Sequence, residues 1–111
     1  MTTHTAARRS SAFWGNLAAT PTRRVAGDGT VLLRLRLSRL DTAALARGVS
    51  EPDATRLLDL TVVGALAELD HGLVDLGDRV HVAAGRMARP SRPGVPVVVA
   101  DADNVAFPTL T

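Results

Sequence analysis

The sequence predicts a mainly β fold, in which five strands and one short helix form a single domain. Three observations support this prediction. The chain has 111 residues, enough for one hydrophobic core. Several segments alternate apolar and polar side chains with the period of a strand, and only one has helical periodicity. Apolar residues make up 46% and charged residues 22%, which is typical of a globular domain rather than a disordered chain.

The first two predicted strands are joined by a tight turn. We expect a strand over residues 10–20 and a turn over residues 25–30, where Gly-Asp-Gly separates two apolar runs. The clearest strand covers residues 31–39, because leucines alternate there with polar side chains. One face carries Leu33, Leu35 and Leu37, and the other carries Arg34, Arg36 and Ser38.

The middle of the chain predicts a loop, a strand and a helix. Residues 41–55 hold Gly, Pro and three acids, which is typical of a connecting loop, with one helical turn over residues 42–47. Residues 56–63 are the third strand. Residues 65–75 predict an amphipathic helix, whose apolar face carries Leu66, Leu69 and Leu73.

The last two strands cover residues 79–87 and 97–107, and a basic, proline-rich hairpin loop joins them over residues 89–96. The order of three strands, a helix and two strands is that of an OB-fold, a five-stranded Greek-key barrel. We expect residues 10–108 to form this domain. Residues 1–9 are predicted to be a flexible N-terminal tail, and residues 109–111 a short C-terminal end.

Charge is distributed unevenly along the chain. The net charge is +2, and the high pI of 10.9 overstates it, because all 13 basic residues are Arg and nothing titrates between His and Arg. Residues 1–47 carry eight Arg and two acids, whereas residues 48–111 carry five Arg and nine acids. The folded molecule could gather its basic parts on one side, or present a solvated surface of mixed sign.

Four segments resemble the bacterial single-stranded DNA-binding protein family, in the family's order. The first runs from Gly-Asn-Leu at 15–17 through Pro21 and Arg24 to Gly-Thr-Val at 29–31. The others are Leu-Thr-Val-Val-Gly-Ala-Leu-Ala-Glu at 60–68, Leu-Gly-Asp-Arg-Val-His-Val at 76–82, and Val-Val-Val-Ala-Asp-Ala-Asp-Asn-Val at 97–105. An extra residue at Ala83-Ala84 suggests a β-bulge.

This resemblance implies an OB-fold that binds single-stranded DNA without sequence preference in replication, repair or recombination. It further implies a cytoplasmic, nucleoid-associated homodimer or homotetramer with replication or repair proteins as partners. No cofactor is expected. The family stacks bases on several aromatic side chains, but this chain has only Phe13, Trp14 and Phe107, with Val63 and Leu57 where aromatics are usual. The family's acidic C-terminal tip is absent from the sequence.

Arginine is the side chain that remains to bind a strand, because its guanidinium grips phosphate in a fork and can lie on a base. In an OB-fold, the face of strands two and three and the neighbouring loops form the nucleic-acid groove. Trp14 is a further candidate for stacking, or for an oligomer interface. The predicted nucleic-acid-binding residues are Arg23, Arg24, Arg34, Arg36, Arg86, Arg89, Arg92 and Trp14.

The alternative is a diverged OB-fold that binds DNA weakly or not at all and serves as a protein interaction or assembly module. Convergence of Arg34, Arg36, Arg89 and Arg92 on one groove would favour DNA binding, and neutralisation of these arginines by Asp59, Glu68 or Asp70 would favour the alternative. The sequence predicts no enzyme and no metal site. It has no Cys, and its three His residues lack metal-ligand spacing. No apolar run approaches the ~18 residues of a membrane span.

Overall fold

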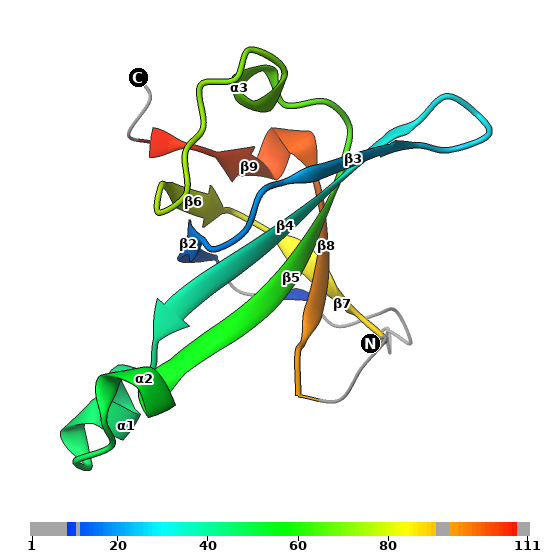
Figure 1. The fold of residues 1–111 in the computed structure, drawn as a ribbon. Helices are drawn as coiled ribbons and strands as arrows, with labels where there is room; N and C mark the ends of the chain where they lie inside the picture. Colours follow the sequence, from blue (N-terminus) through cyan, green and yellow to red (C-terminus); the bar gives the residue numbers. More distant parts are fainter. Residues whose placement is uncertain (1–8, 11, 91–93, 109–111) are drawn as a thin grey trace, which may run out of the picture.

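The computed structural model describes residues 9–10, 12–90 and 94–108. Residues 1–8 of the predicted tail and the end at 109–111 lie outside the described residues, and Arg9 is already paired in a strand. Figure 1 shows the elements in chain order: β1 Arg9–Ser10, β2 Phe13–Leu17, β3 Thr22–Val25, β4 Val31–Leu40, α1 Thr42–Ala46, α2 Glu51–Ala54, β5 Thr55–Val63, α3 Ala67–Asp70, β6 Arg79–Val82, β7 Gly85–Ala88, β8 Val97–Asp101, η1 Ala102–Asn104 and β9 Val105–Ala106.

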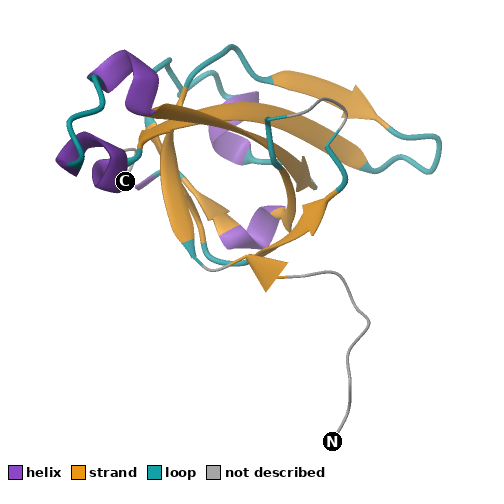
Figure 2. Cartoon of the chain, turned by 90° about the horizontal axis from the view of Figure 1, so that it is seen from below, coloured by secondary structure: helices purple, strands orange, loops and turns teal. Residues whose placement is uncertain are grey.

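The strands form one strongly curved sheet in the order β1-β7-β8-β5-β4-β2-β6-β9, with β3 paired to β4. The pairing of β5 with β8 is parallel, whereas β4 pairs antiparallel with both β2 and β5. Because β6 and β7 are successive parts of one stretch of chain, their two pairings close the sheet into a barrel (Figure 2). This is the Greek-key order of an OB-fold, so the predicted fold is confirmed.

The barrel interior is filled by aliphatic side chains from alternate positions of the long strands. Leu33, Leu35 and Leu37 of β4 are buried, as their alternation predicted, and Arg34 between them is exposed. The same alternation continues across β5, where Leu60 and Val62 are fully buried. Burial of this face therefore fixes which side chains β4 and β5 present to solvent.

The predicted helix over residues 65–75 is much shorter in the structure, where α3 covers only Ala67–Asp70. Gly72 ends it, because its φ of +67° is a left-handed conformation that glycine adopts without strain. The N–H groups of Gly72 and Leu73 donate to the carbonyls of Leu69 and Glu68, which is the Schellman arrangement. Leu73 is consequently 56% exposed instead of lying on a helix face against the core.

The predicted strand over residues 79–87 is divided into β6 and β7. Ala83 and Ala84 lie between the two parts, and the Ala83 N–H donates to the Asn104 carbonyl at 2.8 Å. The first part pairs with β2 and β9, the second with β1 and β8. The extra residue suspected here thus marks a corner at which the chain passes from one side of the barrel to the other. The last strand is likewise interrupted, by η1.

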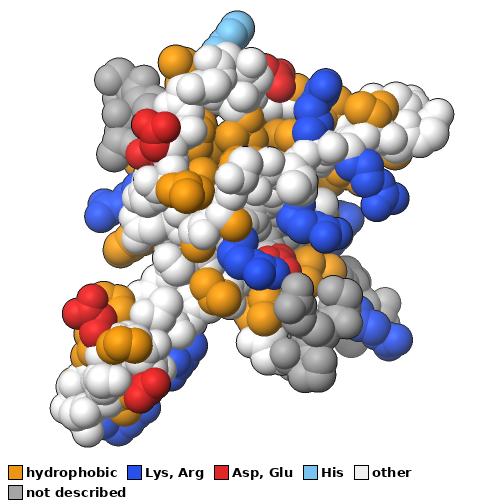
Figure 3. Space-filling model, viewed as in Figure 1, with side chains coloured by type: hydrophobic (Ala, Val, Ile, Leu, Met, Phe, Trp, Pro, Cys, Tyr) orange, Lys and Arg blue, Asp and Glu red, His pale blue; other side chains and the backbone are white. Residues whose placement is uncertain are grey.

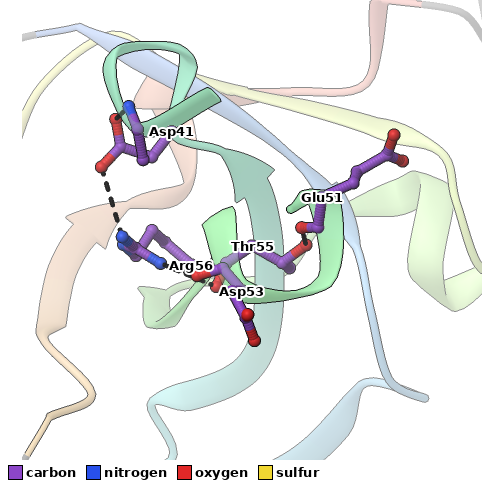
Figure 4. Close-up of polar contacts among 6 residues, drawn as sticks. Asp41, Glu51, Asp53, Thr55 and Arg56 are labelled. Carbon is purple, nitrogen blue, oxygen red and sulfur yellow. Dashed lines mark hydrogen bonds and ion pairs between the residues drawn. The ribbon is translucent and has the colours of Figure 1, made fainter. Parts of the chain in front are cut away.

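The ends of β4 and β5 extend away from the barrel and carry α1 and α2 (Figure 1, lower left). The predicted helical turn at 42–47 is confirmed as α1, but α2 was missed although Pro52 and two acids in its first turn are helix-start signals. The Asp41 carboxylate accepts from the Ala44 N–H at 3.1 Å and pairs with Arg56 at 3.4 Å. Figure 4 shows Asp41 and Arg56 pointing toward each other. The hydrogen bond from Ala44, chiefly, lowers the pKa of Asp41.

The β3–β4 hairpin confirms the predicted turn. The N–H of Ala26 donates to Thr30 O at 2.8 Å, and the Asp28 carboxylate accepts from the Thr30 N–H at 2.9 Å. That backbone hydrogen bond lowers the pKa of Asp28. Within the described residues, no helix has the length and apolar character needed to cross a membrane.

Candidate nucleic-acid interface

One row of side chains crosses the outer face of four neighbouring strands. Arg34 of β4 lies opposite Thr61 of β5, Thr61 opposite Val99 of β8, and Val99 opposite Arg86 of β7. Side chains paired in this way project from the same face of a sheet. The row therefore places a cationic group at each end of a neutral centre.

A groove of about 260 Å³ lies at the β3–β4 end of this row. It is lined by three of the predicted arginines, Arg23, Arg24 and Arg34, together with Leu32 and Thr61. All three arginines are exposed, and among the described residues no hydrogen bond or ion pair engages their guanidinium groups. Figure 3 shows several basic side chains in the region of β3 and β4. The groove can hold an anion with apolar groups beside it.

Arg36 lies two residues after Arg34 on β4, but its electrostatic surroundings are different. Its guanidinium makes a forked pair with the Asp59 carboxylate, with Nε–Oδ1 at 2.8 Å and Nη2–Oδ2 at 3.1 Å. Asp59 is the cross-strand partner of Arg36, so the sheet register itself creates the pair. The hydrogen bond to Asp59 raises the pKa of Arg36. Of the predicted residues, Arg36 is thus already neutralised by a carboxylate.

The other predicted arginines that the structure describes, Arg86 and Arg89, do not line the β3–β4 groove. Arg86 lines a second groove of about 260 Å³ at the far end of the row, with Asp101 and Asn104. Arg89 is exposed beyond the end of β7, and Arg92 lies outside the described residues. Convergence of Arg34, Arg36, Arg89 and Arg92 on one groove is therefore not what the described residues show.

Trp14 lies on a different surface, where β2 pairs with β6. Trp14 is 43% exposed, and the guanidinium carbon of Arg79 lies 4.2 Å from the centre of its ring, a cation–π contact. Phe13 faces the opposite way and packs against the core, as expected for neighbours on a strand. None of the three aromatic side chains of the sequence lines the β3–β4 groove.

Sequence reasoning identified the arginines but missed their neighbours. Only the β4–β5 and β5–β8 pairings bring three further residues onto the same sheet face as the arginines, namely Thr61, Val99 and Asp101. The period-2 alternation shows which side a residue faces, but it carries no information on which residues of another strand lie beside it. The described residues contain no group of three or more His, Cys, Asp or Glu side chains placed to hold a metal ion.

Comparison with known proteins found similarity at the level of structure. No family model and no curated protein sequence matches the chain. A small single-stranded DNA-binding protein from Streptomyces coelicolor superposes with a TM-score of 0.57 at 22% identity, over 94% of this chain and 95% of that one. The chain has the fold of the bacterial single-stranded DNA-binding proteins.

Two further structures show the same fold. The single-stranded DNA-binding domain of a Synechococcus protein matches with a TM-score of 0.58 at 18% identity, over 87% of this chain and 93% of that one. The wild-type single-stranded DNA-binding protein from Thermus aquaticus matches with a TM-score of 0.55 at 25% identity, over 87% of this chain. The chain covers only 38% of that Thermus protein.

Proposed function

We propose that this protein binds single-stranded DNA through the row from the β3–β4 groove to Arg86. The observation that carries the proposal is the groove of about 260 Å³ lined by Arg23, Arg24 and Arg34 on the outer face of an OB-fold. That face is where OB-folds bind oligonucleotides. The fold shared with bacterial single-stranded DNA-binding proteins supports the same ligand.

Binding would be mainly electrostatic. A guanidinium stays charged at any physiological pH and grips a phosphate through two parallel N–H donors. Base stacking on aromatic rings contributes about 1–3 kcal/mol per base in single-strand binders, and this groove has no aromatic lining. The phosphate contacts must therefore supply most of the affinity, which makes it independent of sequence and strongly dependent on salt.

We further propose that this binding supports DNA replication, repair or recombination in the cytoplasm, at the nucleoid. The protein would act as a homodimer or homotetramer and meet replication or repair proteins there. The surface of β2 and β6 around Trp14 supports self-association, because it combines an exposed aromatic ring with an apolar groove of about 350 Å³.

A second candidate function is an interaction module with weak or no DNA binding. The Arg36–Asp59 pair favours it, because a carboxylate in the middle of the strand face repels phosphate and already occupies Arg36. The same pair is compatible with DNA binding if the DNA strand passes over Arg34 rather than over Arg36. The two functions differ in one measurable property, the affinity for a bare oligothymidine.

The test is fluorescence anisotropy of a labelled oligothymidine of about fifteen nucleotides, titrated at low and near-physiological salt. We expect a Kd on the order of micromolar at low salt, with log K falling by about 0.7 per log[salt] for each phosphate contact. R34A should weaken binding roughly five- to tenfold and reduce that slope by about 0.7.

R39A is the matched control. Arg39 is an exposed arginine of the same strand, opposite Arg56 and outside the groove. The R39A substitution removes the same charge as R34A. We expect it to change the Kd by no more than about twofold, since salt screens a distant exposed charge. Absence of binding at low salt, or equal losses in R34A and R39A, would reject the proposed groove and leave the interaction module.

A further inference from the structure

We infer that the groove between β7 and β8 receives a guanine base of the bound strand. The inference rests on the proposed function and adds one base-selective position to a phosphate grip that is otherwise blind to sequence. The groove is lined by Ala84, Gly85, Arg86, Val99, Ala100, Asp101 and Asn104.

The composition of this groove suits a planar heterocycle better than a phosphate. Four of its seven lining residues are Ala, Gly or Val, which give it apolar walls without bulky side chains. The other three form a mixed polar edge of one cation, one carboxylate and one amide, namely Arg86, Asp101 and Asn104. A site built only for phosphate would gain nothing from Asp101, because that carboxylate repels it.

Both charged groups can still take a ligand. Arg86 and Asp101 are exposed, and the described residues give neither of them an ion pair, with each other or with a third side chain. This is the opposite of Arg36 and Asp59, which neutralise each other on the same sheet. A ligand between Arg86 and Asp101 therefore needs to break no existing salt bridge.

The backbone around the polar edge is held in place on both sides. The Asn104 carbonyl accepts from the Ala83 N–H at 2.8 Å, which fastens η1 to the β6–β7 corner. Asp101 lies opposite Val63 in the parallel β5–β8 ladder. Gly64 follows with φ +114°, and a Cβ there would lie 3.1 Å from the Ala102 Cβ, so η1 packs closely on the end of β5. The polar edge thus belongs to the rigid barrel rather than to a loop.

Guanine complements this edge better than the other bases. Its N1–H and N2 amino group are adjacent donors that a single carboxylate, here Asp101, can accept together. Its O6 and N7 are acceptors for an arginine or an amide, here Arg86 and Asn104. Adenine and cytosine offer the carboxylate only one amino group, and thymine offers one N–H between two carbonyl oxygens.

The groove is continuous with the proposed path of the strand. Val99 lines it, Thr61 lines the β3–β4 groove, and these two residues are register partners in the β5–β8 ladder. Arg34 and Arg86 are separated by three strand spacings, roughly 14 Å. A strand held by phosphate contacts at Arg34 can therefore bring a neighbouring base to Arg86 and Asp101.

The experiment compares oligothymidines of about fifteen nucleotides that differ at one central position, which is thymine, guanine, adenine, cytosine or hypoxanthine. We expect the guanine oligomer to bind about five- to tenfold more tightly than the all-thymine one, the gain of one good bidentate base contact. Hypoxanthine lacks only the N2 amino group of guanine, so it should lose most of that gain.

D101N tests the assigned acceptor, and D103N is its matched control. Asp103 is exposed and lies two residues further on, in η1, but it does not line this groove. Both variants remove one negative charge, so each should bind all-thymine DNA at least as tightly as the native protein does. The guanine preference should disappear in D101N and persist in D103N.

Failure of this inference is distinguishable from failure of the proposed function. Equal affinity for all five oligomers, with the all-thymine strand still bound, overturns the guanine position and leaves single-strand binding intact. No binding of any oligomer at low salt overturns both. Isolated dGMP presents the same base without a strand, and binding of dGMP as tight as that of the guanine oligomer would overturn the role assigned to the strand.

Discussion

Arg34 and Arg36 are alike in sequence but differ in the folded protein. Both lie on the outer face of β4, two residues apart. Opposite Arg34 stands the hydroxyl of Thr61, and opposite Arg36 stands the carboxylate of Asp59. Arg34 therefore lines an open basic groove, while Arg36 is held in a forked salt bridge. The residue opposite on the neighbouring strand therefore decides whether an arginine is available to bind a ligand or is already held in a salt bridge.

The same distinction holds between two larger surfaces. The β3–β4 groove gathers three arginines that make no ion pair within the described residues, whereas Arg79 on the β2–β6 surface lies against the ring of Trp14. A cation over an aromatic face is partly satisfied, and the ring beneath it is partly covered. We therefore propose that the nucleic acid binds at the first surface, and we expect the second surface to contribute little to binding.

Removing the difference between Arg34 and Arg36 should have a larger effect than any change at Trp14 or Asp41. D59N removes the carboxylate that neutralises Arg36, so Arg36 becomes a further phosphate ligand. We expect about three- to fivefold tighter binding of oligothymidine at low salt, with a salt slope steeper by up to about 0.7. Anisotropy titrations at several salt concentrations measure both quantities.

The double variant R36A/D59N is the control for net charge, since it has the same formal charge as the native protein. Its affinity should return to within about twofold of the native value, because the freed arginine is then missing. Unchanged or weaker binding of oligothymidine by D59N, with thermal unfolding like that of the native protein, would mean that the DNA does not pass near Arg36.

A smaller effect is expected at Trp14, which is the one Trp of the sequence and therefore the source of its indole fluorescence. If DNA binds over β3–β4, saturation with oligothymidine should leave the Trp14 emission nearly unchanged. Anisotropy of the labelled strand in the same sample verifies that the protein is saturated. Strong quenching would instead support the prediction that Trp14 stacks on a base, and would move the interface toward β2 and β6.

The smallest effect concerns stability at the α1–α2 end, far from the proposed interface. The folded pKa of Asp41 is lowered, so the carboxylate stabilises the native state above its unfolded pKa, and this stabilisation is lost as the pH falls through the folded pKa. D41N keeps an N-cap acceptor but cannot titrate. We expect its Tm to fall less than the native Tm between about pH 5 and about pH 3. D103N, measured by the same thermal scans, should fall as the native protein does.

Local patterns were sufficient for most strands and insufficient where the chain bends. The alternation over residues 31–39 predicted the buried leucines of β4 correctly, because burial on one face follows from period 2 alone. The helical period over residues 65–75 was misleading, because Gly72 stops α3 after one turn. The divided strand at Ala83 and Ala84 was visible only as an extra residue, since a barrel corner is a property of closure.

The sequence by itself determined the β-barrel fold, the resemblance to single-stranded DNA-binding proteins, and the outward direction of Arg34 and Arg36. The tertiary structure decided which of these arginines is paired, that Arg23, Arg24 and Arg34 share a groove, and that Arg86 and Asp101 both line another. The physical reason is register. Alternation along one strand fixes the face of each residue, but the neighbours across the sheet depend on how strands distant in sequence align when the barrel closes.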